Sequence, residues 1–334
     1  MKQLDILTIG DIATDIFIKI KEAEAVCDPD GNDCKLCLDF GAKIPYESVE
    51  TCHAVGNSSN AAISASRLGL KSGLMTSMGD DQNGFDCLKV LEEEGVDLNF
   101  IKKEKDKITS NHYVLWYKGE RTILTKHEKY NYEWTKTKES EDYQTPSWIY
   151  LSSLGENSIS FVEEILKYLD RHTHVKLAFQ PGTLQIKQGY EKLKEIYKKA
   201  DIFLCNKEEA EKILNTNNQE ISKILKGVFG LGPKLVVITD GAQGAYVYDG
   251  NKVWFIRAFE TKPIESTGAG DAFSSTFVSA ILLGKNISEA LIWASVNAAS
   301  VISFTGPHKG LLNKNQIEDY IKNIPDDYKP TIIS

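Results

Sequence analysis

The sequence predicts an α/β fold of three layers, in which helices cover both faces of a mainly parallel β-sheet and a small β-sheet forms a lid. The main observation is the order of elements, because strand-like apolar runs alternate with segments of helical periodicity after about residue 146. Two hairpin-rich segments interrupt this pattern. We therefore expect an α/β core of residues 1–11, 56–104 and 129–334 and a discontinuous lid of residues 12–55 and 105–128.

In the first half of the chain, apolar or alternating runs predict strands, and periodic runs predict helices. Ile6–Ile9 is an apolar run before Gly10, and the alternation of Ile16, Ile18 and Ile20 predicts that this strand continues half-exposed. The further elements expected here are a helix over 60–70, a strand over 73–78, a helix over 85–94 and a hairpin of 113–117 with 122–124.

The second half predicts a regular βαβα series. Strands are expected at 148–152, 176–179, 202–205 and 235–239, and helices at 158–170, 187–199, 207–214 and 219–229. Such an order is typical of a parallel sheet with helices on both faces. Ligands of these sheets bind beyond the carboxyl ends of the strands, so we expect the functional site there.

Composition narrows the class of protein. The 334 residues are 42% hydrophobic and 26% charged, as in folded globular chains. The net charge of −8 provides no basic surface for nucleic acid. Asp5 and Asp11 interrupt the N-terminal apolar run, which therefore predicts a strand and neither a signal peptide nor a membrane span. We expect a cytoplasmic protein that acts on small molecules and binds neither nucleic acid nor membrane.

Four of the six cysteines cluster near the N-terminus: Cys27, Cys34, Cys37 and Cys52. A reducing compartment predicts that most cysteines are thiols. The alternative is zinc, because the Cys34-x-x-Cys37 spacing is compatible with a tetrahedral site. The turn formers of 28–33 predict a hairpin turn, since a calcium loop would need glycine at its sixth position, where Asp33 stands.

The segment Glu265–Phe273 combines a glycine-rich turn with the start of a helix. Unpaired backbone N–H groups at a helix N-terminus bind anions, and glycines let a phosphate approach closely. Asp271 lies in the first turn, where a carboxylate can accept the proton of an attacking hydroxyl. The alternative is that Asp271 only caps the helix.

Several motifs taken together resemble the ribokinase-like (PfkB) family of carbohydrate kinases, over nearly the whole chain. Gly268–Phe273 is similar to the family's C-terminal signature, and Gly56–Gly69 is similar to its N-terminal signature. Asn206–Glu209 resembles an N-x-x-E motif, although these residues also form a capping-box pattern. The resemblance implies a ribokinase-like α/β/α sandwich with a β lid. It also implies ATP-dependent phosphorylation of a sugar hydroxyl, with Mg²⁺.

The resemblance also implies a role for individual residues. Asp271 is the catalytic base, and Gly268, Ala269 and Gly270 form the anion hole. Acceptor-binding residues are expected to be Asp11, Asp15, Lys43, Gly56, Asn57, Asn60 and Arg121. Nucleotide-binding residues are expected to be Asn206, Glu209, Thr239, Gly241, Gly244 and Asn297, with Glu209 also organising magnesium. For Asn297, a position on the surface of a helix is the alternative.

Three departures from the family pattern leave details open. Val55 stands where a first paired glycine is common. Glu265 replaces an aspartate in a segment that helps ribokinases bind a monovalent cation, which leaves dependence on K⁺ open. Gln180 lies in a segment that replaces the frequent D-x-N-x-R pattern, so the identity of the sugar substrate does not follow from that of a known family member.

Other functions stay open at this point. A nucleoside kinase of the same fold differs in its acceptor pocket, and a phosphorylated sugar could meet Lys43, Arg121, Lys126 or Lys129. A sugar-binding regulator on an inactive kinase scaffold is a non-enzymatic alternative. A Rossmann dehydrogenase is disfavoured, because no G-x-G-x-x-G follows the first strand. A homodimer formed through the lid is also open.

Overall fold

The computed structural model describes residues 2–28, 34–134 and 143–333. Its centre is a ten-stranded sheet of order β18-β17-β16-β15-β14-β13-β12-β2-β7-β8. The seven parallel strands are β2 (Ile6–Ile9), β7 (Ser72–Gly79), β8 (Ile101–Glu104), β12 (Trp148–Leu151), β13 (Lys176–Phe179), β14 (Ile202–Asn206) and β15 (Val236–Thr239). The antiparallel edge consists of β16 (Ala245–Tyr248), β17 (Val253–Ile256) and β18 (Thr331–Ile332). The predicted parallel sheet is therefore confirmed for its larger part.

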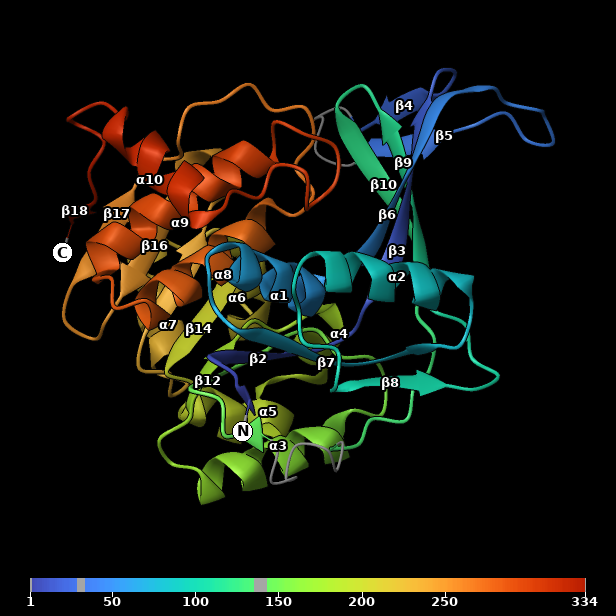
Figure 1. Ribbon diagram of the computed structural model, residues 1–334. Helices are drawn as coiled ribbons and strands as arrows, with labels where there is room; N and C mark the ends of the chain where they lie inside the picture. The colour runs from blue at the N-terminus through green and yellow to red at the C-terminus, as the bar shows by residue number, and fades with distance from the viewer. Residues whose placement is uncertain (1, 29–33, 135–142, 334) are drawn as a thin grey trace.

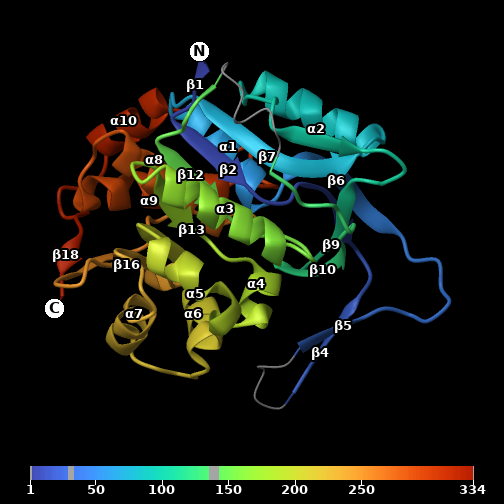
Figure 2. The same cartoon turned by 90° about the horizontal axis from the view of Figure 1, so that it is seen from below.

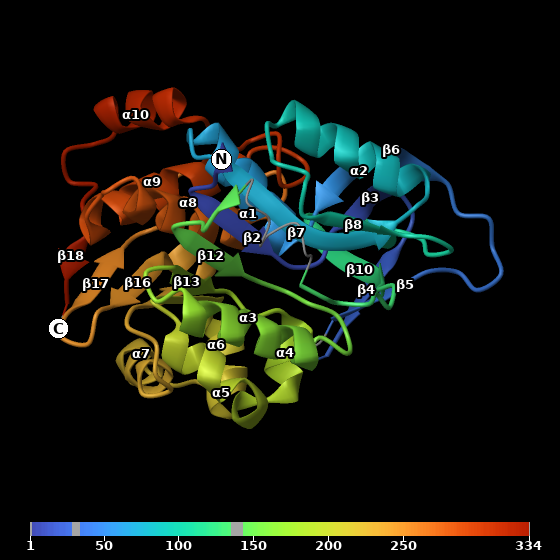
Figure 3. The ribbon, with the colours of Figure 1, turned by 60° about the horizontal axis from the view of Figure 1, so that its bottom comes forward.

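Helices cover both faces of this sheet, as Figure 3 shows. One face carries α1 (Asn57–Arg67), α2 (Gln82–Glu93), α8 (Ala269–Leu282), α9 (Ile287–Val301) and α10 (Lys314–Lys322). The other carries α3 (Ile159–Arg171), α4 (Thr183–Gln188), α5 (Tyr190–Lys199), α6 (Lys207–Leu214) and α7 (Ile221–Phe229). The helix expected over 187–199 is interrupted by Gly189, whose positive φ of 82° ends α4.

The core lies on both sides of the sheet because successive side chains of a strand point to opposite faces. In β12, Ile149 and Leu151 pack with the α3 side, whereas Trp148 and Tyr150 pack with the α8 side. All four are at most 5% exposed. A strand buried on both faces is a continuous apolar run, which explains why the sequence pattern identified these strands.

A second sheet of four strands, which we call the small sheet, rises from one end of the core (Figure 1). Its order is β10 (Glu120–Lys126), β9 (Ser110–Tyr117), β3 (Ala13–Ile20) and β6 (Tyr46–Val55). The strand expected to continue from Ile6–Ile9 is thus a separate strand in another sheet. All four strands come from the two segments proposed as the lid. The chain also contains a short parallel pair, β1 (Lys2–Gln3) with β11 (Tyr143–Gln144).

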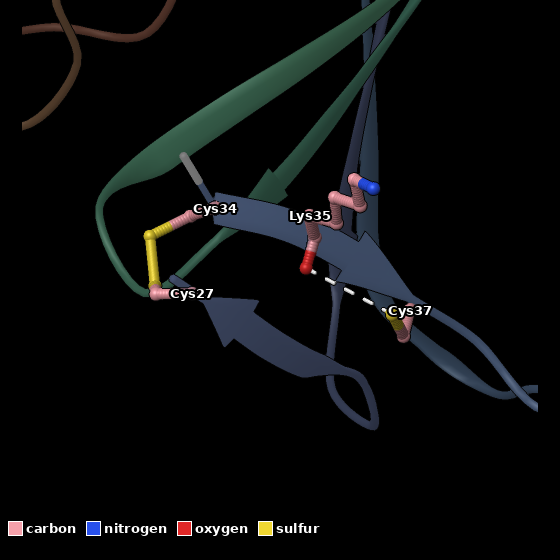
Figure 4. The surroundings of a disulfide bond; sticks show 4 residues. All are labelled: Cys27, Cys34, Lys35 and Cys37. Atoms are coloured by element: carbon pink, nitrogen blue, oxygen red, sulfur yellow. Dashed lines mark hydrogen bonds between the residues drawn. A yellow bond between two sulfur atoms is a disulfide. The ribbon is translucent and has the colours of Figure 1, made fainter. Parts of the chain in front are cut away.

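Beside the small sheet, β4 (Glu24–Cys27) and β5 (Cys34–Cys37) form an exposed antiparallel hairpin, which Figure 2 shows extending from the body. Cys27 and Cys34 face each other across it and form a disulfide (Figure 4), where the sequence predicted thiols. Their direct cross-strand pairing brings the two sulfurs together. The other four cysteines are free, and the predicted turn residues 29–33 lie outside the described part of the chain.

No group of three or more His, Cys, Asp or Glu that could hold a metal is found among the described residues. Within the same residues, no helix combines the length and apolar character that crossing a membrane requires.

Candidate active site

The glycine turn before α8 has the conformation that an anion site needs. Gly268 is the N-cap, with a positive φ of 82°, and a Cβ there would lie 2.5 Å from Pro307 Cβ. At Gly270 an added Cβ would meet nothing within 4 Å, so the space above the first turn is open. No side chain caps the helix, and the Ala269 N–H donates to the Ser266 carbonyl oxygen at 3.4 Å, so the following N–H groups of the first turn are the ones available to a bound anion.

Asp271 lies at this helix start and accepts two amide hydrogen bonds. Asn60 Nδ2 donates to Oδ2 at 2.7 Å, and Gln180 Nε2 donates to Oδ1 at 3.1 Å. Burial raises the pKa of Asp271, the two amide hydrogen bonds oppose that rise, and the charge of Asp15 adds to it. The arrangement provides a carboxylate beside an anion-binding turn, as a general base for phosphoryl transfer requires.

Asp15 reaches the same region from β3 of the small sheet. It is 8% exposed, and His112 Nδ1 of the neighbouring strand β9 donates to its Oδ1 at 3.0 Å. His112 Nε2 is buried and has no hydrogen-bond partner in the described part of the protein. An unpartnered ring nitrogen next to a carboxylate can bind a ligand hydroxyl.

Asp11 follows β2 and lies at the carboxyl edge of the large sheet. Tyr132 OH donates to Asp11 Oδ1 at 2.7 Å and accepts from the backbone N–H of Gly155 at 2.8 Å. Burial raises the pKa of Asp11 to about 7, although Tyr132, Gly155 and His112 all lower it. Gly56 fits closely against this residue, since a Cβ there would lie 2.7 Å from the Asp11 carbonyl oxygen. Asn57 is the next residue and begins α1.

The residues expected to bind nucleotide follow β14 and β15. Asn206 and Glu209 form the predicted capping box, with Glu209 N–H donating to Asn206 Oδ1 at 2.8 Å and Asn206 N–H donating to Glu209 Oε2 at 3.0 Å. Burial raises the pKa of Glu209, and the charge of Asp271 contributes, which places both carboxylates in one electrostatic environment. Thr239 ends β15, and Gly241 and Gly244 follow with positive φ of 51° and 106°. A Cβ at Gly241 would meet nothing within 4 Å, whereas one at Gly244 would lie 2.1 Å from the Ile256 carbonyl oxygen.

Glu209 fits the magnesium role, because Mg²⁺ takes few protein ligands and completes its shell with water and phosphate oxygens. A monovalent cation fits less well. Glu265 is buried and one carboxylate oxygen, Oε2, has no partner in the described residues, but Oε1 already faces the Arg121 guanidinium at 3.5 Å. A bound cation would place a second positive charge beside Arg121 while the small sheet has this position.

Arg121 extends from β10 of the small sheet to the turn before α8, where it also contacts Ser266 Oγ. Glu265 Oε1 in turn accepts from the N–H of Thr267 at 2.7 Å. Arg121 is therefore engaged with the loop that carries the anion site, and the sequence had placed it at the acceptor.

Two expected site residues lie elsewhere. Asn297 is fully buried in α9, donates to Thr276 Oγ1 at 2.7 Å and accepts from the Leu312 N–H at 2.9 Å. Neither an adenine contact nor a surface position fits this environment, since both ends of its amide are used inside the core. Lys43 lies on the exposed loop between β5 and β6, which extends away from the body (Figure 2).

Sequence reasoning missed four residues of the site: Gln180, His112, Tyr132 and His308. The sequence marks Gln180 only as a departure from a family pattern, and no motif spacing points to His112, His308 or Tyr132. His308 Nε2 contacts Asn60 Oδ1 at 2.8 Å across 248 positions of sequence. Contacts over such separations leave no periodic signal in a single sequence.

Comparison with known proteins identifies the family. The model for "pfkB family carbohydrate kinase" matches residues 22–313. The 5-dehydro-2-deoxygluconokinase of Bacillus subtilis (strain 168) is 27% identical over 308 residues, which cover 86% of this chain and 94% of that protein.

Two solved structures share the fold. Arabidopsis thaliana ribokinase complexed with ribose and ATP superposes with a TM-score of 0.78 at 17% identity, covering 97% of this chain and 100% of that one. Methanocaldococcus jannaschii nucleoside kinase, an archaeal member of the ribokinase family, gives a TM-score of 0.75 at 18% identity, covering 96% and 99%. The predicted three-layer fold with a small sheet is thereby confirmed as ribokinase-like.

Proposed function

Since the chain belongs to the pfkB family of carbohydrate kinases, we propose that it transfers the terminal phosphoryl group of ATP to a sugar hydroxyl, with Asp271 as the general base. The observation that carries the proposal is the position of Asp271, in the first turn of α8 beside Gly268, Ala269 and Gly270. The family assignment makes the protein a phosphotransferase that acts on an alcohol group.

Each part of the site has one task in this reaction. Asp271 takes the proton of the attacking hydroxyl, while the N–H groups of the glycine turn hold the charge of the transferred phosphoryl group. Glu209 would hold Mg²⁺ through its bound water, and the ion supplies charge neutralisation on the phosphates. Asn206, Thr239, Gly241 and Gly244 are proposed to contact the nucleotide.

The acceptor is proposed to bind between the small sheet and the helix start, against Asp15, His112, Asn60 and Asp11. These side chains donate and accept hydrogen bonds, which suits the vicinal hydroxyls of a free sugar. Two cations that could meet a phosphorylated acceptor have carboxylate partners: Arg121 pairs with Glu265 at 3.5 Å, and Lys129 pairs with Glu156 at 2.7 Å. Gly56 and Asn57, at the start of α1, are proposed to border the acceptor. The segments 12–55 and 105–128, which contain the small sheet, are proposed to act as the lid.

An acceptor screen tests the proposal. A coupled assay of nucleotide consumption with magnesium is run over free pentoses and hexoses, phosphorylated sugars and nucleosides. We expect turnover of a free sugar first. If nucleosides are used at least tenfold more efficiently than every sugar tested, the protein is a nucleoside kinase. If nucleotide binds but no acceptor is turned over, the result supports a sugar-binding regulator on an inactive kinase scaffold.

We also propose that the protein forms a homodimer through the outer face of the small sheet. Cross-strand neighbours share a face, so Tyr113, Leu124 and Ile16 form one row, and Ile18, Leu115 and Val49 form the next. Tyr113, Leu124 and Val49 are 41%, 53% and 47% exposed, whereas Val114 and Phe17 on the inner face are buried. A contiguous exposed apolar face of this kind supports an interface between two copies.

Because the donor is ATP, the proposed location is the cytoplasm.

A further inference from the structure

The side-chain amides of Asn60 and Gln180, which donate to Asp271, each make a second hydrogen bond on the side away from it. Asn60 is 5% exposed, and its Oδ1 contacts His308 Nε2 at 2.8 Å. Gln180 is 7% exposed, and its Oε1 accepts from the hydroxyl of Tyr150, which is fully buried. Each amide therefore has a hydrogen-bond donor on one side and the carboxylate of Asp271 on the other.

The polarity of the hydrogen bonds fixes the orientation of both amides. A carboxylate accepts only, so Asn60 and Gln180 turn their N–H₂ groups toward Asp271 and their oxygens toward His308 and Tyr150. His308 must then carry its hydrogen on Nε2. Burial and the charge of Arg67 lower the pKa of His308 to about 4, which keeps the ring neutral with one N–H to donate.

The loop that carries His308 is anchored to α1. Arg67 Nη1 donates to the carbonyl oxygens of His308 and Leu311, at 2.7 and 2.6 Å. The Arg67 side chain also forms a two-point ion pair with Glu94, with nitrogen–oxygen distances of 2.8 and 2.6 Å. The imidazole is thus attached to the same helix that carries Asn60.

We propose that Asn60 and Gln180 form an amide clamp that fixes the orientation of the catalytic carboxylate of Asp271, with His308 and Tyr150 as positioning residues that fix the two amides. Neither outer residue touches Asp271; each acts through one amide. A flipped amide would turn its oxygen toward the carboxylate, where two acceptors repel each other, and would lose the hydrogen bond that its oxygen accepts from His308 or Tyr150. The inference rests on the proposed function, because it requires Asp271 to be the base.

The clamp also affects the proton affinity of the base. The amides lower the pKa of Asp271, against the effect of burial, so the loss of either one raises it. The ionisable groups that face Asp271 are Asp15 from the small sheet, Glu209 from α6 and Tyr150 from β12, with His308 one residue removed. Changes at the outer residues leave Asp15 and Glu209 in place, so the effect of the clamp is separable.

The test compares variants that differ in one donor. His308→Leu removes the donor, and His308→Gln keeps an N–H near the position of Nε2. Gln180→Leu removes one arm of the clamp, and Tyr150→Phe removes only the hydroxyl behind it. Tyr328→Phe is the matched control, because its buried hydroxyl contacts Ser295 and the Arg257 carbonyl and no residue of the site.

For His308→Leu and Gln180→Leu we expect kcat to fall roughly tenfold to a hundredfold, with the KM for ATP within about threefold of wild type. The acidic limb of the pH profile of kcat should move to higher pH. His308→Gln should recover most of the loss, and Tyr328→Phe should have wild-type kcat whatever its thermal stability.

Folded variants of His308 and Gln180 with wild-type kcat and an unmoved acidic limb would overturn the clamp. If a Leu variant does not fold, Tyr150→Phe and the pair His308→Gln and His308→Asn decide, since Asn retains polarity but is too short to reach Asn60. Asp271→Asn distinguishes a failure of the clamp from a failure of the proposed function. If Asp271→Asn is inactive and the clamp variants have wild-type kcat, only the clamp is wrong. If Asp271→Asn is active, Asp271 is not the base.

Discussion

Arg121 of the small sheet and Glu265 of the core form an ion pair, with 3.5 Å between Nη1 and Oε1, beside the glycine turn that precedes α8. Glu265 is 4% exposed and holds the Thr267 N–H on the same oxygen. A buried carboxylate needs a counter-charge, and here a strand of the small sheet supplies it. The position of the small sheet and the conformation of the glycine turn are therefore connected.

We expect Arg121→Ala to lower kcat/KM for the acceptor by about tenfold or more, because a buried charge at Glu265 loses its partner. Arg121→Lys should recover only part of this, since an ammonium group lacks the second donor of the guanidinium fork. Steady-state kinetics of Arg121→Ala, Glu265→Gln and the double variant form a thermodynamic cycle. Additive effects would mean that Arg121 does not act through Glu265.

The buried carboxyl of Asp11 is expected to make stability depend on pH. Its pKa rises from 3.8 to about 7 on folding, so its favourable contribution is fully present below pH 3.8 and is lost as the pH rises through about 7. The difference corresponds to at most about 4 kcal/mol. Asp11→Asn should therefore unfold at a higher temperature than wild type at pH 8, with little difference at pH 4, in calorimetric scans.

The same variant should bind the acceptor more weakly, because Asp11 is proposed as an acceptor ligand and functional sites often retain such unfavourable groups. An equal unfolding temperature of Asp11→Asn and wild type at pH 8 would mean that Asp11 is not buried as a charge in the native protein.

The outer face of the small sheet is expected to determine the oligomeric state. Leu124→Asp places a charge on the exposed apolar face of the small sheet and should convert a dimer into a monomer in sedimentation equilibrium. Ile333→Asp is the matched control, because Ile333 is similarly exposed, at 52%, near the C-terminus. A monomeric wild-type protein at micromolar concentration would exclude the interface.

The cysteines give a prediction that mass spectrometry can check. Alkylation of the unfolded protein should modify four cysteines without reduction and all six after reduction, because Cys27 and Cys34 are joined. Six modified cysteines without reduction would show that the pair is not formed in solution. One equivalent of zinc that is lost on Cys34→Ser with Cys37→Ser would restore the metal interpretation.

Local patterns predicted the elements that carry the site, because their signals lie within a few residues. The start of α8 follows from the glycines around Ala269, and the capping box of α6 follows from the three-residue spacing of Asn206 and Glu209. Both are features of backbone geometry that a short window of sequence contains.

The supporting contacts could not be predicted in this way. Gln180 and Asp271 are 91 positions apart, and Asn60 and His308 are 248 positions apart, so only the folded sheet brings them together. Asn297 shows the converse error, since a polar residue on a helix does not indicate by itself whether it faces a ligand or bonds inside the core. Burial and partners decide that, and both depend on tertiary structure.

The role of Asp271 as the base of phosphoryl transfer is tested most directly by measuring the turnover of Asp271→Asn. The substitution keeps the size of the side chain and removes the negative charge and the proton acceptor, and its amide nitrogen replaces one of the two oxygens that accept from Asn60 and Gln180. We expect kcat to fall by roughly two or more orders of magnitude, with ATP affinity by calorimetry within about threefold of wild type. Turnover within a few-fold of wild type, on the acceptor that the screen identifies, would contradict the account.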